Sequence, residues 1–285
     1  MLKKLITLLS FLCFIYLLGV LTGRYRLFPY GIVNEYLNVH KQSQTGPYND
    51  VSDRIVSKTQ GTDNVKVFIT LGQSNSSNSG ELFKTDYDGV FNYYNGKTYQ
   101  YKDPSLGTTG KGMSVWGLIG RELIVSGYTD KVVFLNLGVG GISLKQVTSG
   151  DLYSSFVNSY NELTKIYGKV DGILFHQGER NNENVSGHDG YYKDFVDFTE
   201  RNKINNILSP LYLCQTSYCN NTIDRELLQI QDSLIKNLNN ILRGPNTDLI
   251  TYFNYRANDN CHLSKKGLEW FSKEFSKKII ESKEE

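Results

Sequence analysis

Short apolar runs rich in β-branched and aromatic residues recur along the chain, and longer segments with helical spacing separate them. The runs predict five β-strands, at residues 65–71, 131–137, 170–175, 210–215 and 248–253. The longer segments predict helices at residues 115–127, 191–204, 224–242 and 263–280. Apolar strands that alternate with amphipathic helices are typical of a parallel sheet with helices on both faces. We therefore predict an α/β fold with a mainly parallel five-stranded sheet between two helical layers.

The last predicted helix has the clearest periodicity. Leu268, Phe271, Phe275 and Ile279 recur every three or four residues and so share one face. Ser264 precedes them and is a suitable N-cap. We expect this face to pack against the sheet.

The first 26 residues differ in character from the rest of the chain. Lysines precede an apolar stretch of 18 residues, Leu5–Thr22, and arginines follow it. About 20 apolar residues span a bilayer, and about 17 is the lower limit. A secretory signal has an apolar core of about 7–15 residues, and Leu21-Thr22-Gly23 is a poor cleavage site. The sequence therefore favours one transmembrane helix within residues 1–26, which anchors the protein in a membrane, over a cleaved signal peptide.

Residues 27–62 are largely polar and have no sustained period, which indicates a tether that leads into a domain at residues 63–285. Single N-terminal anchors mostly leave the bulk of the chain outside the cytoplasm, and we expect this here; secretion after signal cleavage is the alternative. Cys219 and Cys261 lie in polar loops past two predicted strands. If those strands are neighbours, the cysteines share one rim of the sheet and can form a disulfide; in a cytoplasmic domain they stay free.

Charge and motif content exclude several classes of function. The 31 basic and 29 acidic residues leave a net charge of +2, and no long basic run is present, so we expect no nucleic-acid partner. The sequence has no H-E-x-x-H motif, no paired C-x-x-C and no Asp-rich loop, so we expect no metal. The glycine-rich stretch at 138–143 lacks the lysine of a P-loop, so we expect no cofactor.

Four polar clusters each follow an apolar run. They are GQSN (72–75), GVGGIS (138–143), HQGER (176–180) and NDNCHLS (258–264). Sites in parallel sheets form at the carboxyl ends of the strands, where all four clusters are expected to lie. Acyl transfer needs a nucleophile, a base, an acid that orients the base, and donors for the oxyanion. The four clusters contain residues of each kind.

Ser74, at a strand-to-helix turn, is the candidate nucleophile, and His262 is the candidate base. Asp259, three residues before His262, can orient its imidazole. Candidate oxyanion donors are the backbone N–H groups of Ser74 and Gly141 and the side-chain amide of Gln177. Each pattern alone is common in loops, so the interpretation depends on their joint order at strand ends.

These clusters, in this order, resemble the four blocks of the SGNH hydrolase superfamily. More narrowly they resemble its sialate O-acetylesterase-like branch, which includes carbohydrate esterase family 6. Residues 91–105 and 114–123 also resemble the region that follows the nucleophile there, and the resemblance covers roughly residues 63–283. It implies a flavodoxin-like α/β/α fold and metal-free removal of acetyl groups from sugars.

The resemblance also implies roles for individual residues. Ser74 matches the nucleophile, and Asp259 and His262 match the dyad of the last block. Gly141 matches the oxyanion glycine of the second block, with Gly140 as the alternative if the alignment shifts by one. Gln177 stands where other SGNH branches use asparagine as the third oxyanion donor.

Three further residues are candidates for supporting roles. Glu179 matches the family's glutamate after HQG; it either braces a main-chain loop, which we favour, or competes with Asp259 as the partner of His262. His176 follows an apolar run and by itself indicates a buried core histidine, and Asn75 completes the first block. The chain departs from the family pattern at Ile142 and at Arg180-Asn181, which affects the pocket wall more than the chemistry.

The sequence therefore predicts a serine esterase that removes O-acetyl groups from a carbohydrate: sialic acid, a cell-surface glycan or a plant-type polysaccharide. Two alternatives stay open. The same residues can transfer the acetyl group to another sugar, or the domain can bind glycans without turnover. Residues 79–112, which follow the nucleophile, are expected to border the pocket, where their tyrosines either contact sugar or pack the loop.

Overall fold

The computed structural model describes residues 2–25, 46–59 and 64–282. The chain divides into two units, Met1–Ser43 and Gln44–Glu285. The first contains one described helix, α1 (Leu2–Tyr25). The second contains the sheet and every candidate site residue. Residues 27–45 and 60–62 of the predicted tether lie outside the described residues.

The structure corrects the sequence prediction of a membrane-spanning helix. Among the described residues, no helix combines the length and the apolar character that a membrane crossing requires. The prediction of a transmembrane helix is therefore wrong.

The second unit is built on one eight-stranded mixed sheet, not the five strands predicted. Its strand order is β1-β4-β3-β5-β2-β6-β7-β8. The pairs from β3 through β8 are parallel, whereas β4 pairs antiparallel with β3 and β1. The strands are β1 (Val56–Ser57), β2 (Val65–Gly72), β3 (Val90–Tyr94), β4 (Lys97–Gln100), β5 (Lys131–Gly138), β6 (Gly172–His176), β7 (Leu211–Gln215) and β8 (Ile241–Asn246).

Two of the additional strands, β3 and β4, form a hairpin within residues 79–112. Asn95 and Gly96 connect them, with φ angles of 47° and 78°. Positive φ at both positions suits a tight hairpin turn, and Asn-Gly between alternating residues is its strongest sequence signal. The turn signal is present in the sequence, but β3 and β4 are short and β4 is largely polar, so apolar runs do not predict them.

The last strand lies earlier than predicted. β8 occupies Ile241–Asn246, and the predicted strand at 248–253 begins instead within a 3₁₀ turn, Thr247–Leu249. Helix α7 (Arg225–Asn237) accordingly ends before the predicted boundary of 242. Proline lacks a backbone N–H and is tolerated on edge strands, and Pro245 lies on the edge strand β8. Because glycine and proline usually interrupt strands, the Gly244-Pro245 pair prevents this strand from being predicted from the sequence.

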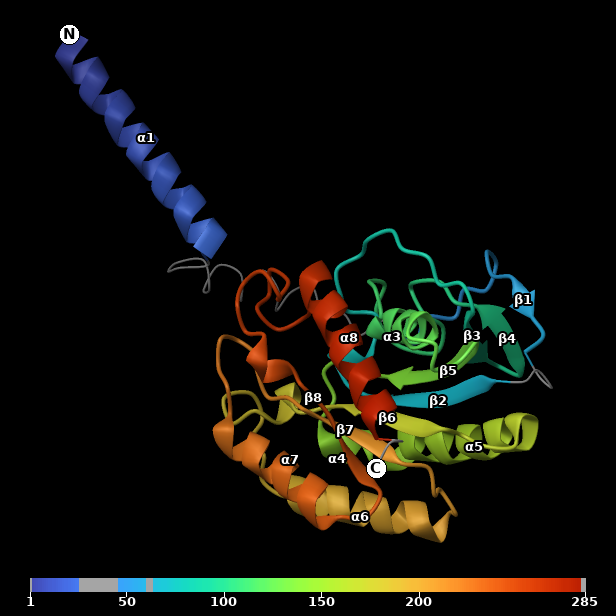
Figure 1. Ribbon diagram of the computed structural model, residues 1–285. Helices are drawn as coiled ribbons and strands as arrows, with labels where there is room; N and C mark the ends of the chain where they lie inside the picture. The colour runs from blue at the N-terminus through green and yellow to red at the C-terminus, as the bar shows by residue number, and fades with distance from the viewer. Residues whose placement is uncertain (1, 26–45, 60–63, 283–285) are drawn as a thin grey trace. The chain divides into compact units, whose positions relative to one another are not determined.

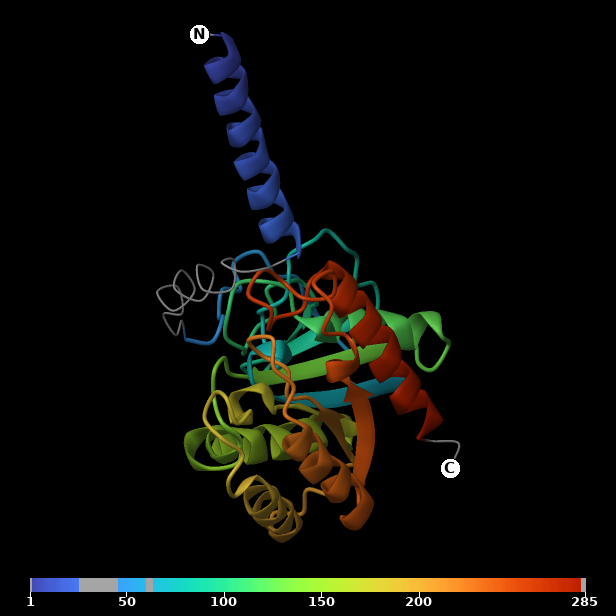
Figure 2. The same ribbon diagram turned by 90° about the vertical axis from the view of Figure 1, so that its left-hand side faces the viewer.

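Helices cover both faces of the sheet (Figures 1 and 2). On one face lie α3 (Val115–Val125) and α8 (Lys265–Glu281), packed on Phe68 and Phe134. On the other lie α4 (Leu144–Val147), α5 (Gly150–Tyr167), α6 (Tyr191–Ile204) and α7, packed on Val67 and Ile69. Helix α5 was not predicted, although its buried side chains recur at helical spacing. This three-layer α/β/α arrangement is the one that the sequence resemblance implies.

Helix α8 matches its prediction closely. Leu268, Phe271, Phe275 and Ile279 are all buried, and the Ser264 side chain accepts a hydrogen bond from the backbone at the helix start. The Phe271 ring lies 5.0 Å from the His176 ring, measured between centroids. The helix therefore packs its apolar face beneath the third polar cluster.

The sheet register brings three of the polar clusters to one level. Gly72, at the end of β2, pairs with Gly138 of β5 and with His176 of β6. A Cβ atom on Gly72 would lie 2.0 Å from the carbonyl oxygen of His176, and the φ of Gly72 is 146°. Only glycine fits this close approach. The first three clusters therefore begin side by side at the carboxyl edge of the sheet.

Candidate active site

Ser74 begins a buried 3₁₀ turn directly after β2. Ser77 fixes this turn, because its backbone N–H and its hydroxyl both donate to the Ser74 carbonyl, at 2.9 and 2.7 Å. Among the described residues, neither the hydroxyl nor the backbone N–H of Ser74 has a hydrogen-bond partner. The turn thus holds the backbone firmly and leaves both groups of Ser74 available to a substrate.

His262 and Asp259 form a compact pair in the loop before α8. His262 Nδ1 lies 2.5 Å from Asp259 Oδ2, while Asp259 Oδ1 accepts the backbone N–H of His262 at 2.9 Å. Burial raises the pKa of Asp259, but the charge and hydrogen bond of His262 outweigh burial and hold this pKa below its usual range. Burial lowers the pKa of His262, but Asp259 outweighs that effect and raises it. The carboxylate therefore orients the ring and stabilises its protonated form.

Asn75 joins the nucleophile loop to the loop of the base. Its side-chain amide donates to the Cys261 carbonyl at 3.3 Å and to Glu179 Oε1 at 2.6 Å. Asn75 follows Ser74, and Cys261 precedes His262, so the first, third and fourth clusters meet here. Within the described part of the chain, no hydrogen bond joins the Ser74 hydroxyl to the His262 ring. Such catalytic hydrogen bonds commonly tighten only in a substrate complex.

The second cluster lies beside Ser74 and offers one available donor. A Cβ atom on Gly140 would lie 4.0 Å from Ser74 Cβ. The N–H of Gly140 already donates to Thr109 Oγ1 at 2.7 Å. The N–H of Gly141 has no acceptor among the described residues, and this glycine is exposed with a φ of 73°. The geometry therefore favours Gly141 over Gly140 as the oxyanion glycine.

Gln177 is fully buried, and its amide nitrogen is engaged with the protein. Nε2 donates to Asn181 Oδ1 at 2.7 Å and to Gln73 Oε1 at 3.2 Å. Gln73 Oε1 also accepts the backbone N–H groups of Gly178 and Arg180. In this arrangement Gln177 braces the third loop, and its role as an oxyanion donor stays a prediction. Sequence reasoning gave Gln73 no role and related Asn181 only to the pocket wall, because their importance lies in these contacts between loops.

Glu179 lies beneath the site and is almost completely buried. Its Oε1 lies 3.2 Å from His176 Nε2 and accepts the Asn75 amide. Burial raises the pKa of Glu179, but the His176 charge and the hydrogen bonds from His176 and Asn75 outweigh burial and lower it to about 2. The hydrogen-bond partner of His262 is Asp259. The geometry therefore favours the bracing role for Glu179 over competition with Asp259.

Arg256 is a buried residue of the fourth loop that the sequence analysis did not single out. Its guanidinium donates to three carbonyl oxygens: those of Ile250, Cys261 and Thr247, at 2.8, 2.8 and 2.6 Å. The Cys261 carbonyl thus accepts from both Arg256 and the nucleophile loop, directly before His262. An arginine in a polar loop gives no sequence signal for such a role.

A disulfide between Cys219 and Cys261 links the loop after β7 to the loop that carries His262. The Cα atoms are 4.5 Å apart, and the sequence separation is 42 residues. The base therefore adjoins a covalent link on one side and helix α8 on the other.

Removing this disulfide is expected to lower the free energy of unfolding by about 2–4 kcal/mol, since the crosslink restricts the unfolded chain. Urea denaturation of a Cys219→Ser/Cys261→Ser variant measures this loss. Cys13→Ser, which removes an exposed free thiol, is the matched control and should not change the midpoint. An unchanged midpoint in the double variant would contradict the expectation.

One group of possible metal ligands was found in the described part of the chain: Glu183, His188 and Asp224. His188 Nδ1 lies 2.9 Å from Asp224 Oδ2, and Asp224 Oδ1 accepts the backbone N–H of Leu227 as the N-cap of α7. Ion pairing and helix capping therefore account for these contacts without a metal.

Comparisons with known proteins give the family of the domain and the likeness of its fold. Residues 64–281 match the family model described as carbohydrate esterase, sialic acid-specific acetylesterase. A solved structure of a protein from Arabidopsis thaliana matches with a TM-score of 0.61 and 14% identity, covering 76% of this chain and 98% of that one. A structure described as NanS matches with a TM-score of 0.56 and 14% identity, covering 78% and 98%. No curated protein matches the chain. At these identities the solved structures show the fold alone, while the family match confirms the resemblance seen in the sequence.

Proposed function

This chain belongs to the sialic acid-specific acetylesterase family of carbohydrate esterases, and from that premise we propose that it is a serine esterase. Its substrate is an O-acetylated carbohydrate, and the reaction proceeds through an acetyl-enzyme on Ser74. The observation that carries the proposal is the Asp259–His262 pair, whose loop Asn75 joins to the nucleophile turn.

The mechanism follows from the available groups. Neutral His262 takes the proton of the Ser74 hydroxyl as its oxygen attacks the acetyl carbonyl, and Asp259 stabilises the resulting imidazolium. The N–H groups of Ser74 and Gly141 stabilise the oxyanion, with the Gln177 amide as a third donor only if it leaves its present partners. The protonated base then returns its proton to the departing sugar hydroxyl. Water, activated by the same histidine, attacks the acetyl-enzyme and releases acetate.

Two other functions are compatible with the same fold and the same residues. An O-acetyltransferase would form the same acetyl-enzyme but pass the acetyl group to a second sugar. A glycan-binding domain without turnover would need no available nucleophile, and the unbonded Ser74 hydroxyl weighs against it. Hydrolysis therefore has the stronger support, and the choice of acceptor separates it from transfer.

The test follows the acetyl group. The full-length protein is incubated with 4-nitrophenyl acetate and with O-acetylated sugars, and the acetyl-enzyme is trapped by rapid acid quench for mass spectrometry. We expect an added mass of one acetyl group on the peptide that contains Ser74, followed by release of free acetate. Acetyl transfer to added sugar in preference to water would favour the transferase. A folded protein that neither forms the adduct nor releases acetate would contradict the proposed function.

We also propose that the second unit works outside the cytoplasm. The Cys219–Cys261 disulfide supports this location, because such bonds persist mainly in oxidising compartments. Fractionation of the native host, with thiol labelling before and after reduction, tests it. Fully labelled Cys219 and Cys261 in unreduced cytosolic protein would contradict it.

A further inference from the structure

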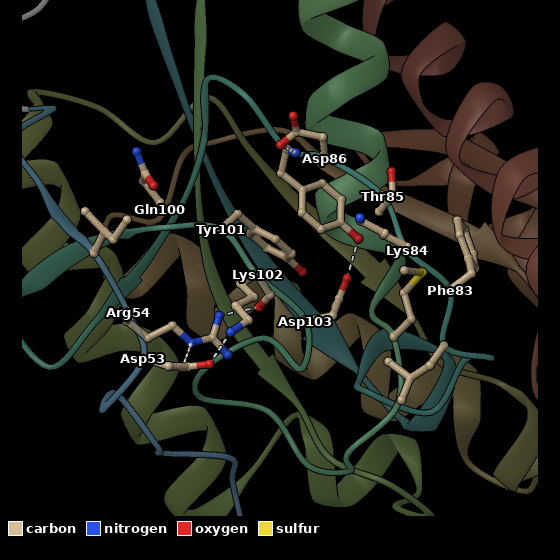
Figure 3. Close-up of a pocket in the computed structure, with 14 residues that line it drawn as sticks. Asp53, Arg54, Phe83, Lys84, Thr85, Asp86, Gln100, Tyr101, Lys102 and Asp103 are labelled. Atoms are coloured by element: carbon tan, nitrogen blue, oxygen red, sulfur yellow. Dashed lines mark hydrogen bonds and ion pairs between the residues drawn. The ribbon is translucent and has the colours of Figure 1, made fainter.

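A cavity of about 330 Å³ opens beside residues 79–112 (Figure 3). Residues 82–87, 100–103 and Met113 line most of it, and residues 53–55 close the remaining side. Small-molecule sites typically have volumes of about 300–1,000 Å³. This cavity lies at the lower end of that range, which is large enough for one ring-sized ligand.

The wall of this cavity is joined to the loop of the catalytic base. The backbone N–H of Glu81 donates to the Leu263 carbonyl at 3.1 Å, and Leu263 directly follows His262. Glu81 Oε2 accepts the backbone N–H of Lys265 at 2.8 Å. The Lys265 ammonium in turn lies 5.1 Å from the centre of the Phe83 ring, which lines the cavity. The segment that lines the cavity is therefore anchored to the loop that carries His262.

Several contacts hold the cavity in shape. The Asp103 carboxylate accepts the Tyr87 hydroxyl and the backbone N–H of Ser114. Arg121 Nη1 donates to Thr85 Oγ1 at 2.9 Å. On the opposite side, the buried side chain of Arg54 donates to the carbonyl oxygens of Lys102 and Pro104, which follow β4. The walls are thus preformed, which lowers the entropic cost of binding.

The side chains of the cavity carry both signs of charge in equal number. Three carboxylates and three cations line it: Asp53, Asp86, Asp103, Arg54, Lys84 and Lys102. Figure 3 shows these residues distributed around the cavity and not gathered by sign. Asp53 pairs with Lys102, whereas Lys84 and Asp86 are exposed. With its charges balanced, the cavity has no net field and does not select an anionic ligand.

Apolar surface accompanies these polar groups. Leu82 is 58% exposed and Ile55 is 63% exposed, and both line the cavity. Exposed apolar carbon next to charged hydrogen-bonding groups suits a neutral sugar ring, which has hydroxyls at its edge and C–H groups on its faces. A free acetate or a phosphate would use only the cations.

We propose that this cavity is a second sugar subsite, which holds a neutral sugar unit of the same chain that presents its acetyl ester to Ser74. The inference rests on the proposed esterase function and extends it: the substrate is an oligosaccharide or polysaccharide with neutral units, not a free monosaccharide. Chain binding in the cavity then lowers KM for long substrates and has no effect on small esters.

The experiment compares chain lengths in the full-length protein. Substrates are 4-nitrophenyl acetate, O-acetylated monosaccharides, and O-acetylated xylo-, manno- and cello-oligosaccharides of up to six units. The test variant is Leu82→Ala/Lys84→Ala, which alters two exposed cavity residues. The control, Lys203→Ala/Leu208→Ala, removes the same two side-chain types at the amino-terminal side of β7.

We expect wild-type kcat/KM to rise with chain length in at least one series, and the test variant to lose about tenfold, or 1.4 kcal/mol, on that series. The loss should appear in KM, with 4-nitrophenyl acetate unaffected and the control like wild type. Equal rates on monosaccharides and all chains, or a variant that loses activity equally on every ester, would overturn the subsite. No acetate release from any ester by wild type would overturn the proposed function itself, so the two failures are distinguishable.

Discussion

Replacing Ser74 with alanine is expected to lower kcat for acetate release by about 10⁴-fold or more. The variant loses the hydroxyl that forms the acetyl-enzyme, so only binding and the oxyanion donors can still accelerate attack by water. The protein should fold normally, since the hydroxyl of Ser74 makes no hydrogen bond among the described residues. Initial rates with 4-nitrophenyl acetate and with an O-acetylated sugar measure the loss, and circular dichroism checks the fold.

Ser77→Ala is the matched control for this substitution. It removes a hydroxyl from the same turn, together with its hydrogen bond to the Ser74 carbonyl. We expect a stability loss of about 1 kcal/mol from that bond and a kcat within about tenfold of wild type. The assignment of Ser74 as the nucleophile would be contradicted if Ser74→Ala kept most of the wild-type kcat. It would also be contradicted if Ser77→Ala lowered kcat as much as Ser74→Ala does.

The sequence predicted the central sheet well because those strands are buried on both faces and therefore appear as uninterrupted apolar runs. β2 and β5 differ from their predicted bounds by one residue at most. The strands nearer the two margins of the sheet follow different rules. β8 contains Gly244 and Pro245, which an edge strand tolerates, and β4 is held in a hairpin by an Asn-Gly turn. Apolar runs alone therefore detect the core of such a sheet and miss its margins.

Some residues of the candidate site could likewise be predicted from the sequence, whereas others could not. The sequence singled out Ser74, Asp259 and His262 because acyl transfer requires these residue types at strand ends. Sequence reasoning gave no account of Arg256 or Gln73, which work by hydrogen-bonding to main-chain groups of other loops. Such contacts depend on which carbonyls the fold brings within reach. Three-dimensional structure is needed to recognise them.

The pH dependence of the wild-type enzyme follows from the raised pKa of His262. The base accepts the Ser74 proton only when it is neutral, so kcat/KM should rise with pH through this pKa and then reach a plateau. Since Asp259 is the largest cause that raises the pKa, the acid limb should lie above the usual histidine value of about 6.5. Removing the negative charge of Asp259 should lower the pKa of His262 and so move the acid limb of the pH profile to lower pH.

Asp259→Asn and Glu179→Gln test which carboxylate serves the base. Asparagine at 259 can keep Oδ1 as acceptor of the Cys261 and His262 backbone N–H groups, while its NH₂ replaces the oxygen that faces His262 Nδ1. The ring must then carry its proton on Nε2 and cannot accept one from Ser74. We expect kcat to fall about 10⁴-fold, with the acid limb displaced to lower pH.

Glu179→Gln removes the other buried carboxylate and serves as the comparison. Glutamine can still accept the Asn75 amide but lacks the carboxylate that faces His176 Nε2. We expect a loss of about 1–3 kcal/mol in the free energy of unfolding, a small displacement of the acid limb to lower pH and a largely retained plateau rate. Full pH profiles of kcat/KM for both variants, with urea denaturation, separate these effects. If Glu179→Gln abolished turnover while Asp259→Asn retained it, the two carboxylates would exchange roles, and His262 would take its orientation from beneath the site and not from its own loop.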